Sequence, residues 1–325
     1  MKRFSLLTLV GAVAVLISGI AAAADITFRA GHSAAPGEPY DEGLKHMKAG
    51  LEKATNGKAT MQIFPNSQLG NEPDMIKGVL TGTLDISVPS NAPLTAFVPE
   101  LKIFDMPFLF KDQRHMNRVL RGPARDEIAK AVAEKNMQLL GVYGVGTRHI
   151  MTTKKSVSSI DDLKGLKIRT MQSQFHLDAF RAFGANPTAV NYSELYGSLQ
   201  TGVVDGAEAA NTNYFNQKFY EQAPNWAMVG WLILTAPLIM QKQKFDGLAK
   251  DVQAALMKSG EESAVFEQDL YNKTDDALFE DLKKKGIKVT QPDLKPFLAA
   301  SKQVHEKHLT SDTDKRILKL IQDTQ

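Results

Sequence analysis

The residue best placed for ligand chemistry is Arg169, which ends a short apolar segment after a glycine. Residues 159–170 read Ser-Ile-Asp-Asp-Leu-Lys-Gly-Leu-Lys-Ile-Arg-Thr, which predicts a helical turn, a break at Gly165 and a strand that ends at Arg169. A residue at the carboxyl end of a strand in an α/β sheet points into the ligand crevice. An arginine there can hold a carboxylate through two parallel hydrogen bonds. A surface salt bridge is the usual role of an arginine, so the residues alone leave both interpretations open.

The motifs that mark common catalytic sites are missing from the sequence. It contains no G-x-S-x-G, H-E-x-x-H or G-x-x-x-x-G-K-[ST] pattern, and the glycines at 141–146 have the wrong order for a dinucleotide fingerprint. His305 and His308 lie one helical turn apart and could share a metal ion, but the charged residues around them favour a solvated helix face. The chain has no cysteine, which excludes a thiol nucleophile. We therefore expect a binding protein without catalytic residues, metal or cofactor.

The first 24 residues have the order of a secretory signal peptide. Lys2 and Arg3 precede an apolar stretch over residues 4–20, and alanines at 21–24 offer a cleavage site before Asp25. A membrane anchor is the alternative, but the stretch is shorter than the ~20 apolar residues that a span needs. We therefore expect the mature chain to work in the periplasm. The 39 basic and 36 acidic side chains of the full sequence give no charge signature of a nucleic-acid partner.

The 325 residues are long enough for about two domains. Apolar and polar residues alternate over 26–30 and 59–63, as in strands, and residues 40–54 between them have the apolar spacing of a helix. This strand–helix–strand order predicts an α/β sheet. A proline-free stretch from about residue 250 to 285 predicts a helix of about 50 Å, the width of two lobes. The apolar segments 141–146 and 231–237 are candidate strands that cross between the lobes.

An internal echo supports two related halves. Residues 75–85 predict a helix, a Thr-Gly break and a strand, and residues 195–205 repeat this pattern 120 positions later with the same Thr-Gly-x-x-Asp. A glycine after a helix is common by itself, but the matched motif is more specific. The echo predicts two α/β lobes built on related plans, with a binding site between them.

Several longer motifs resemble those of DctP-type solute-binding proteins, the extracytoplasmic receptors of tripartite ATP-independent periplasmic (TRAP) transporters. The resemblance covers nearly the whole mature chain in order, and it rests on segments at 64–72, 107–110, 164–169, 183–187, 194–196, 199–206 and 218–221. It implies a two-lobed periplasmic-binding-protein architecture with hinge strands, a long helix that spans both lobes, and closure over one organic acid. It also implies integral-membrane TRAP permease subunits as partners.

The resemblance also implies a set of ligand-binding positions. In this sequence the matching residues are Arg169, Arg148, Glu72, Asn91, His32 and Gln172. In the family, the position of Arg169 pairs with the substrate carboxylate, and that of Arg148 is a second basic residue of the cleft. Glu72 and Asn91 match polar positions of the first lobe. His32 matches a cleft residue after the first strand, and Gln172 a frequent ligand contact.

One segment departs from the family pattern. Many members read Gln/Ala-Glu-Asn after the Asp-Gly at 205–206, but here Ala209 takes the place of the asparagine. Asn211 or Asn213 is the natural substitute, and Tyr214 or Phe215 could wall the pocket. A site rich in amide and acid groups favours a hydroxylated acid, such as a uronate or an aldonate.

The resulting expectation is a receptor with residues 25–145 and about 235–274 in lobe I, and residues 146–234 and about 275–325 in lobe II. It would bind a small carboxylate by hinge closure and deliver it to a TRAP permease. A receptor for a C4-dicarboxylate or a 2-oxoacid is the alternative within the same system. A receptor for an ATP-driven importer and an exported sugar-acid enzyme are more distant alternatives.

Overall fold

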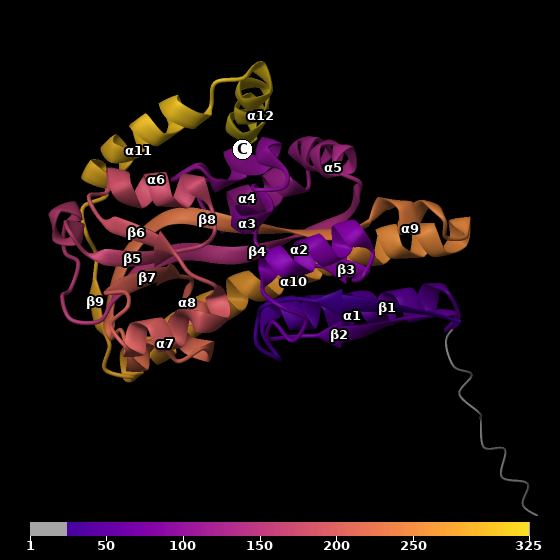
Figure 1. Cartoon of the computed structure of the whole chain (residues 1–325), viewed down its shortest axis with the longest axis horizontal. Helices are drawn as coiled ribbons and strands as arrows, with labels where there is room; N and C mark the ends of the chain where they lie inside the picture. The colour runs from indigo at the N-terminus through magenta and orange to yellow at the C-terminus, as the bar shows by residue number, and fades with distance from the viewer. Residues whose placement is uncertain (1–24, 325) are drawn as a thin grey trace, which may run out of the picture.

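The computed structural model describes residues 25–324, which form one mixed sheet covered by helices (Figure 1). The nine strands have the order β2-β1-β3-β8-β4-β7-β5-β6, with β9 paired to β8. Their bounds are β1 Ile26–Gly31, β2 Ala59–Phe64, β3 Ile86–Ser87, β4 Met137–Thr152, β5 Lys167–Thr170, β6 Asn186–Ala189, β7 Gly206–Ala209, β8 Asn225–Gln241 and β9 Lys288–Thr290.

The helices pack on both faces of this sheet. The α-helices are α1 Pro39–Ala54, α2 Glu72–Thr81, α3 Asn91–Leu94, α4 Gln113–Leu120, α5 Ala124–Glu134, α6 Gln174–Ala182, α7 Leu195–Gln200, α8 Asn211–Asn216, α9 Lys242–Asp246, α10 Lys250–Lys284, α11 Lys295–His308 and α12 Asp312–Asp323. Four short 3₁₀ turns are η1 Pro99–Asp105, η2 Ile160–Leu163, η3 Tyr192–Glu194 and η4 Phe219–Glu221. Among residues 25–324, no helix is long and apolar enough to cross a membrane. The predicted signal peptide lies outside the described residues.

The strand order is symmetric about its centre, which divides the protein into two lobes. Parallel strands β2-β1-β3 form the first lobe, and parallel strands β6-β5-β7 form the second. The long antiparallel strands β4 and β8 join them and run side by side across the middle of Figure 1. They contain the predicted crossing segments at 141–146 and 231–237. The predicted two-lobed α/β architecture with hinge strands is confirmed.

The Thr-Gly-x-x-Asp echo has the same structural role in both lobes. Gly82 and Gly202 adopt left-handed φ angles of 77° and 73° after α2 and α7. Asp85 then accepts a hydrogen bond from the backbone N–H of Arg29 in β1 (2.7 Å), and Asp205 accepts one from that of Lys167 in β5 (2.9 Å). In each lobe the aspartate therefore ties the chain after the helix to the central strand, which confirms the prediction of related plans.

The 35-residue helix α10 packs against helix α1 of the first lobe, against strand β4, and against helix α8 of the second lobe. Helix α10 can lie close to β4 because Gly260 of the helix meets Gly141 of the strand. A Cβ on Gly260 would lie 2.5 Å from the carbonyl oxygen of Leu140. The carboxylate of Glu267 in α10 accepts the N–H of Gly144 (2.8 Å), where the pairing of β4 with β8 is irregular. The predicted helix across both lobes is confirmed.

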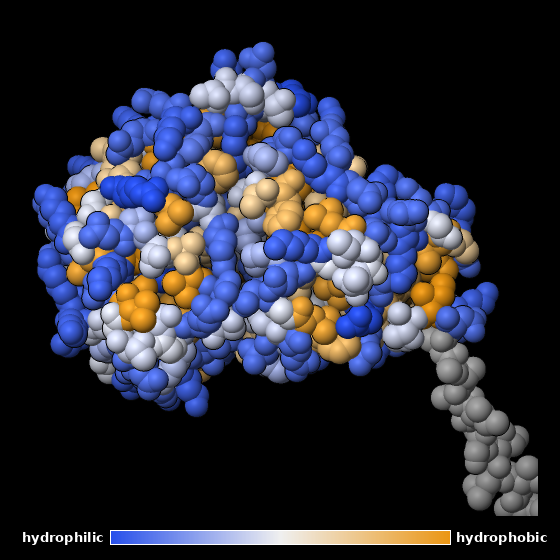
Figure 2. Space-filling model, in the orientation of Figure 1, coloured by the Kyte–Doolittle hydropathy of each residue, from blue (hydrophilic) through white to orange (hydrophobic). Residues whose placement is uncertain are grey.

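The chain after α10 contacts both lobes. Helix α11 packs against α6, whereas α12 packs against α5 and η1 at the top of Figure 1. The predicted lobe boundaries within residues 25–145, 146–234, 235–274 and 275–325 stay predictions. On the face of Figure 2, hydrophilic residues predominate and apolar ones form small separate groups.

Candidate ligand-binding site

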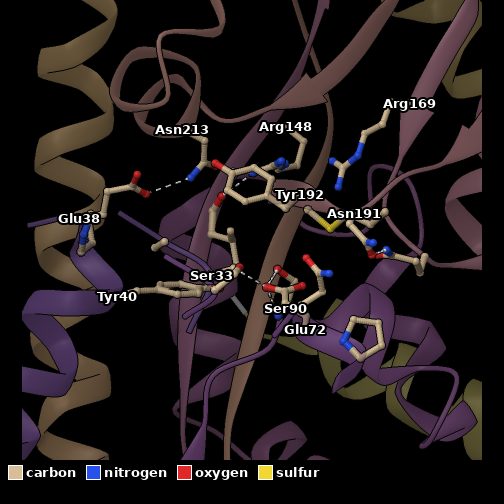
Figure 3. Close-up of a pocket in the computed structure, with 18 of the residues that line it drawn as sticks. Ser33, Glu38, Tyr40, Glu72, Ser90, Arg148, Arg169, Asn191, Tyr192 and Asn213 are labelled. Carbon is tan, nitrogen blue, oxygen red and sulfur yellow. Dashed lines mark hydrogen bonds between the residues drawn. The ribbon is translucent and has the colours of Figure 1, made fainter. Parts of the chain in front are cut away.

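A cavity of about 600 Å³, its mouth included, lies between the lobes (Figure 3). First-lobe residues enter it from the ends of β1 and β3 and from the starts of α1 and α2. Second-lobe residues come from β4, from β5 and the segment after it, and from η3 and α8, and Tyr271 comes from α10. The lining residues are Ser33, Ala34, Glu38, Pro39, Tyr40, Ser67, Asn71, Glu72, Pro73, Ser90, Val145, Arg148, Arg169, Met171, Gln172, Asn191, Tyr192, Asn213 and Tyr271.

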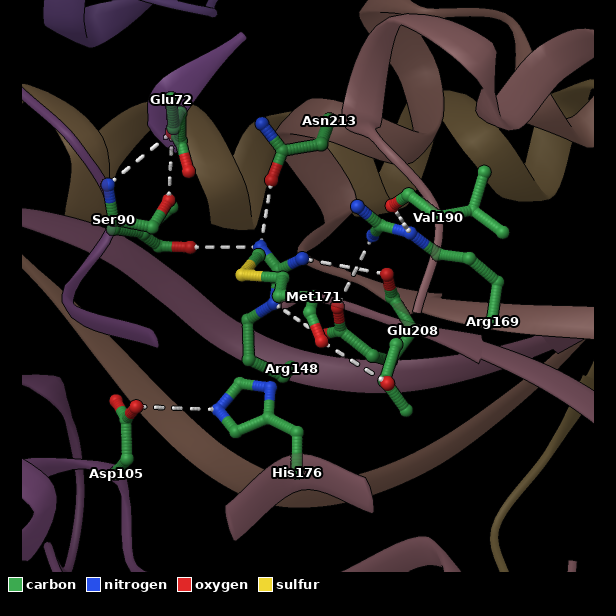
Figure 4. A network of polar contacts seen from close by, with 12 residues as sticks. Glu72, Ser90, Asp105, Arg148, Arg169, Met171, His176, Val190, Glu208 and Asn213 are labelled. Atoms are coloured by element: carbon green, nitrogen blue, oxygen red, sulfur yellow. Dashed lines mark hydrogen bonds and ion pairs between the residues drawn. The ribbon is translucent and has the colours of Figure 1, made fainter. Parts of the chain in front are cut away.

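Two buried arginines share one buried carboxylate at the second-lobe side of this cavity. Glu208 of β7 lies between Arg148 of β4 and Arg169 of β5 (Figure 4). Nε of Arg148 donates to Oε2 of Glu208 at 2.7 Å, whereas Nη1 of Arg169 stays 3.6 Å from Oε1 without a hydrogen bond. Nε of Arg169 donates to the carbonyl of Val190 at 2.9 Å, which fixes the guanidinium plane. Arg169 is therefore oriented but only partly neutralised.

The pKa values follow this unequal sharing. Burial favours the neutral form of Glu208, but the charges of Arg148 and Arg169 outweigh it and hold the pKa of Glu208 below its ordinary value. For Arg148, the attraction of Glu208 overcomes burial, so its pKa is raised. For Arg169, burial dominates and its pKa is lowered. An arginine remains charged in proteins, so the group carries a net positive charge that an anionic ligand would balance.

Glu72 forms a second polar group on the first-lobe side. Its Oε1 accepts hydrogen bonds from Oγ of Ser33 (2.8 Å) and from N and Oγ of Ser90 (3.2 and 3.1 Å). Burial raises its pKa despite these bonds. Because all three donors meet Oε1, Oε2 is left to face the cavity as an acceptor.

One hydrogen bond crosses the cavity from lobe to lobe. Nδ2 of Asn213, in α8, donates to Oε2 of Glu38, which precedes α1 (3.2 Å). At the mouth, Oγ of Ser193 in η3 donates to Oδ1 of Asn71 before α2 (2.8 Å). Both bonds require the lobes to be close together, so the structure has a closed cleft.

The predicted site residues divide into two groups by location. Arg169, Arg148, Glu72, Gln172 and Asn213 line the cavity. Asn91, His32, Asn211 and Tyr214 are buried outside its lining. The side chains of the second group contact other parts of the protein.

His32 and Asn91 each miss the cavity by one residue. The neighbouring Ser33 and Ser90 line it, whereas His32 points toward Asp41, 3.5 Å away. The Asn91 amide donates to Leu101 and Asp105 (3.0 Å each). Successive side chains of an extended chain point to opposite sides, which accounts for the pair after β1, whereas Ser90 is the N-cap of α3 and Asn91 its first residue.

The choice between Asn211 and Asn213 follows from the helix that carries them. Asn211 faces α10, where its amide donates to Asp275 (3.1 Å) and accepts from Nε1 of Trp226 (3.1 Å). Asn213 lies two residues further, on the other side of α8, and lines the cavity. Tyr214 stacks on Trp226 with ring centroids 4.0 Å apart.

Several residues of the site were absent from the sequence-based set, above all the cavity residues Glu38, Tyr40 and Tyr192, and the buried Glu208 that pairs with Arg148. Glu208 stands alone among small apolar residues at 206–210, and a single carboxylate in a buried strand is a signal for a charged partner. Glu38 precedes Pro39 at a helix start, where Ser, Thr, Asp or Asn is the usual residue. These two signals could have identified both glutamates.

The two histidines weighed as a metal site contact different groups. Nε2 of His305 meets the carbonyl of Pro107, and Nε2 of His308 meets the carboxylate of Asp178, each at 2.8 Å. Within residues 25–324, no group of three or more His, Cys, Asp or Glu side chains is arranged to hold a metal ion.

Residues 30–312 match the sequence pattern of the family DctP, bacterial extracellular solute-binding protein, family 7. The chain belongs to the DctP family. The predicted resemblance to TRAP solute-binding proteins is therefore confirmed, and this DctP-family protein is a solute receptor, not an enzyme.

Individual relatives extend the match in sequence and structure. The C4-dicarboxylate-binding periplasmic protein DctP of Rhodobacter capsulatus is 31% identical over 281 residues, 86% of this chain and 84% of its own. A TRAP periplasmic solute-binding protein of Bradyrhizobium sp. BTAi1, in complex with α/β-D-galacturonate, is 34% identical with a TM-score of 0.89. One from Roseobacter denitrificans, with bound β-D-glucuronate, is 31% identical with a TM-score of 0.88. Both structures cover 92% of this DctP-family chain and are themselves covered completely.

Proposed function

We propose that this protein is a periplasmic receptor that captures a hydroxylated sugar acid, a uronate or an aldonate, and delivers it to a TRAP permease. The carboxylate binds Arg169, and Glu72, Asn213 and the other polar lining residues bind hydroxyl groups. Closure of the lobes completes the contacts, because each lobe supplies part of the wall. Residues 1–24 direct export and are then removed.

The observation that carries this proposal is the incomplete pairing of Arg169. Its Nη1 is buried in the cavity wall, 3.6 Å from the nearest carboxylate oxygen and without a hydrogen-bond partner among the described residues. A ligand carboxylate supplies both the acceptor and the negative charge that this guanidinium lacks. The uronates in the two solved relatives are sugar acids of this chemistry.

A C4-dicarboxylate is the second candidate, because the Rhodobacter capsulatus relative is named for binding one. The cavity favours a hydroxylated acid. Its wall has several neutral or acidic oxygen groups, whereas the charge of Arg148 is already engaged by Glu208 at 2.7 Å.

Excess galacturonate or glucuronate should raise the melting temperature of the purified protein. A ligand that binds only the folded state stabilises it by about 2.7 kcal/mol at 100 times its Kd. Thermal melting should be followed with uronates, aldonates, C4-dicarboxylates and 2-oxoacids, and with galactose and glucose as controls that keep the ring but lack the carboxylate. Stabilisation by neutral sugars or amino acids, with none from any organic acid, contradicts the proposed function.

Replacing Glu72 with glutamine should change the preference among hydroxylated acids more than it changes carboxylate binding. The glutamine carbonyl can still accept the bonds from Ser33 and Ser90, but the second oxygen becomes an NH₂ donor toward the ligand. Losing one hydrogen bond to a charged acceptor should cost about 1.5–3 kcal/mol for acids whose hydroxyl donates there. Calorimetric titration with galacturonate, glucuronate and galactonate measures the change. An equal loss for all three acids points to a structural role of Glu72.

A further inference from the structure

The cavity has a second pole of unsatisfied polar atoms, whose carboxyl group, that of Glu38, lies on the opposite side from Arg169 in Figure 3. Oε1 of Glu38 and the hydroxyls of Tyr40, Tyr192 and Tyr271 are buried and have no hydrogen-bond partner among the described residues. All four residues line the cavity. Figure 3 places Glu38 and Arg169 on opposite sides, with the ring of Tyr192 between them in this view.

The orientation of Glu38 is set by a chain of hydrogen bonds that starts at Arg148. The guanidinium can only donate, so Oδ1 of Asn213 must be the atom that accepts from Nη1 of Arg148 (2.8 Å). Nδ2 of Asn213 is therefore the atom that faces Glu38 and donates to Oε2 (3.2 Å). This leaves Oε1 as the free oxygen of that carboxyl group.

The local sequence also leaves the Glu38 side chain available. It occupies the N-cap position of α1 but makes no capping hydrogen bond. In the first turn of α1, Oδ2 of Asp41 accepts the N–H of Gly37, which lies before the helix, at 2.8 Å. Burial raises the pKa of Glu38 to about 7, although the backbone of Ala35, the amides of Asn213 and Gln217 and the charge of Arg148 act against it. Near neutral pH its free oxygen can therefore accept a proton or a hydrogen bond from a ligand hydroxyl.

Arg148 is not free to bind a second carboxylate of a ligand at this pole. Its Nε donates to Glu208, its Nη1 to Val145 and Asn213, and its Nη2 to the backbone oxygen of Glu208. A second carboxylate on a ligand would meet the carboxyl of Glu38 instead of an uncommitted cation. Two carboxylates in one desolvated site repel each other.

We propose that Glu38, with the hydroxyls of Tyr192 and Tyr271, forms a hydroxyl-binding subsite that makes the receptor select polyhydroxylated monocarboxylates over dicarboxylates. This inference rests on the proposed function, since it assumes that the ligand carboxylate lies on Arg169. A ligand hydroxyl donates to Oε1 of Glu38 and accepts from a tyrosine hydroxyl. A ligand without hydroxyls leaves these buried groups unpaired, and such a site rejects it strongly.

Isothermal titration of galacturonate and succinate into wild-type protein, Glu38→Gln and Tyr192→Phe tests this subsite. Wild-type protein should prefer galacturonate. Glu38→Gln should bind galacturonate at least tenfold more weakly and succinate equally or more tightly, because the repelling acid is removed. Tyr192→Phe keeps the ring and should weaken galacturonate binding three- to tenfold without weakening succinate. Glu42→Gln is the matched control, because it removes a glutamate one turn further along, in α1 and outside the cavity lining, and should change neither affinity.

The outcomes separate this inference from the function on which it rests. If wild-type protein binds galacturonate and both variants change the two affinities by the same factor, or not at all, the subsite is overturned and the receptor function stands. A wild-type preference for succinate also overturns the subsite. If wild-type protein binds no organic acid, the proposed function itself fails. Melting curves of the empty variants verify that each one is folded.

Discussion

Replacing Arg169 with alanine should weaken binding of the sugar acid by about 3–5 kcal/mol, because the ligand carboxylate would be buried in a closed cleft without its cation. That loss exceeds a hundredfold in Kd. The effect should be large because the structure offers no substitute at this place: the charge of Arg148 is committed to Glu208 at 2.7 Å. Calorimetric titration of the variant with galacturonate measures it.

Lysine at position 169 separates charge from geometry. It keeps the positive charge but lacks the planar fork, so one of two parallel hydrogen bonds is lost. The expected cost is about 1.5–3 kcal/mol, roughly ten- to a hundredfold in Kd. The empty Arg169→Ala and Arg169→Lys proteins should melt close to wild type, since burial already disfavours the Arg169 charge. If the alanine variant binds within about twofold of wild type, the carboxylate anchor lies elsewhere and Arg148 is the next candidate.

Arg169 could be predicted from the sequence because a simple rule links its position to its surroundings. The glycine break and the apolar run place it near the end of β5, and strand ends in α/β sheets face the ligand crevice. The long helix α10 and the crossing strands could be predicted for a similar reason, because length and apolar spacing are local properties. Which elements pack next to them, in contrast, depends on the tertiary fold and cannot be read from the local sequence.

His32 and Asn91 show why the rest of the site was harder to predict. Near a strand end, the choice of the cavity-facing residue depends on where the extended chain stops alternating, and a shift of one residue reverses the direction of the side chain. The bound of β1 is Gly31, so Ser33 and not His32 lines the cavity. Ser90 and Asn91 also differ, because the chain turns into α3 between them. The selection of Asn213 over Asn211 likewise depends on which face of α8 meets α10.

Glu208 is the residue whose role depends most on tertiary structure, because its partners come from β4 and β5, 60 and 39 positions away. Replacing it with glutamine should lower the free energy of unfolding of the empty protein by about 3–5 kcal/mol. Glutamine keeps the size and an acceptor for Nε of Arg148, but two buried guanidinium groups then lack their counter-ion. Urea unfolding measures the loss. Asp161→Asn is the control, since it breaks an ion pair with Lys164 that is 73% exposed on both sides and should change stability by less than about 0.5 kcal/mol.

The ligand and the pH should both change the loss of stability in Glu208→Gln. A bound sugar acid brings a negative charge to Arg169, so excess galacturonate should raise the melting temperature of Glu208→Gln more than that of wild type. The pKa of Glu208 in the folded protein lies below the ordinary value of a glutamate, because Arg148 and Arg169 favour its charged form. Its stabilising charge is therefore fully present above that ordinary value and is lost as the pH falls through the folded value. The stability difference between wild type and Glu208→Gln should therefore be constant near neutral pH and shrink in acid. A difference that stays constant into acid, or a variant as stable as wild type at pH 7, shows that the two arginines do not depend on Glu208 for charge balance.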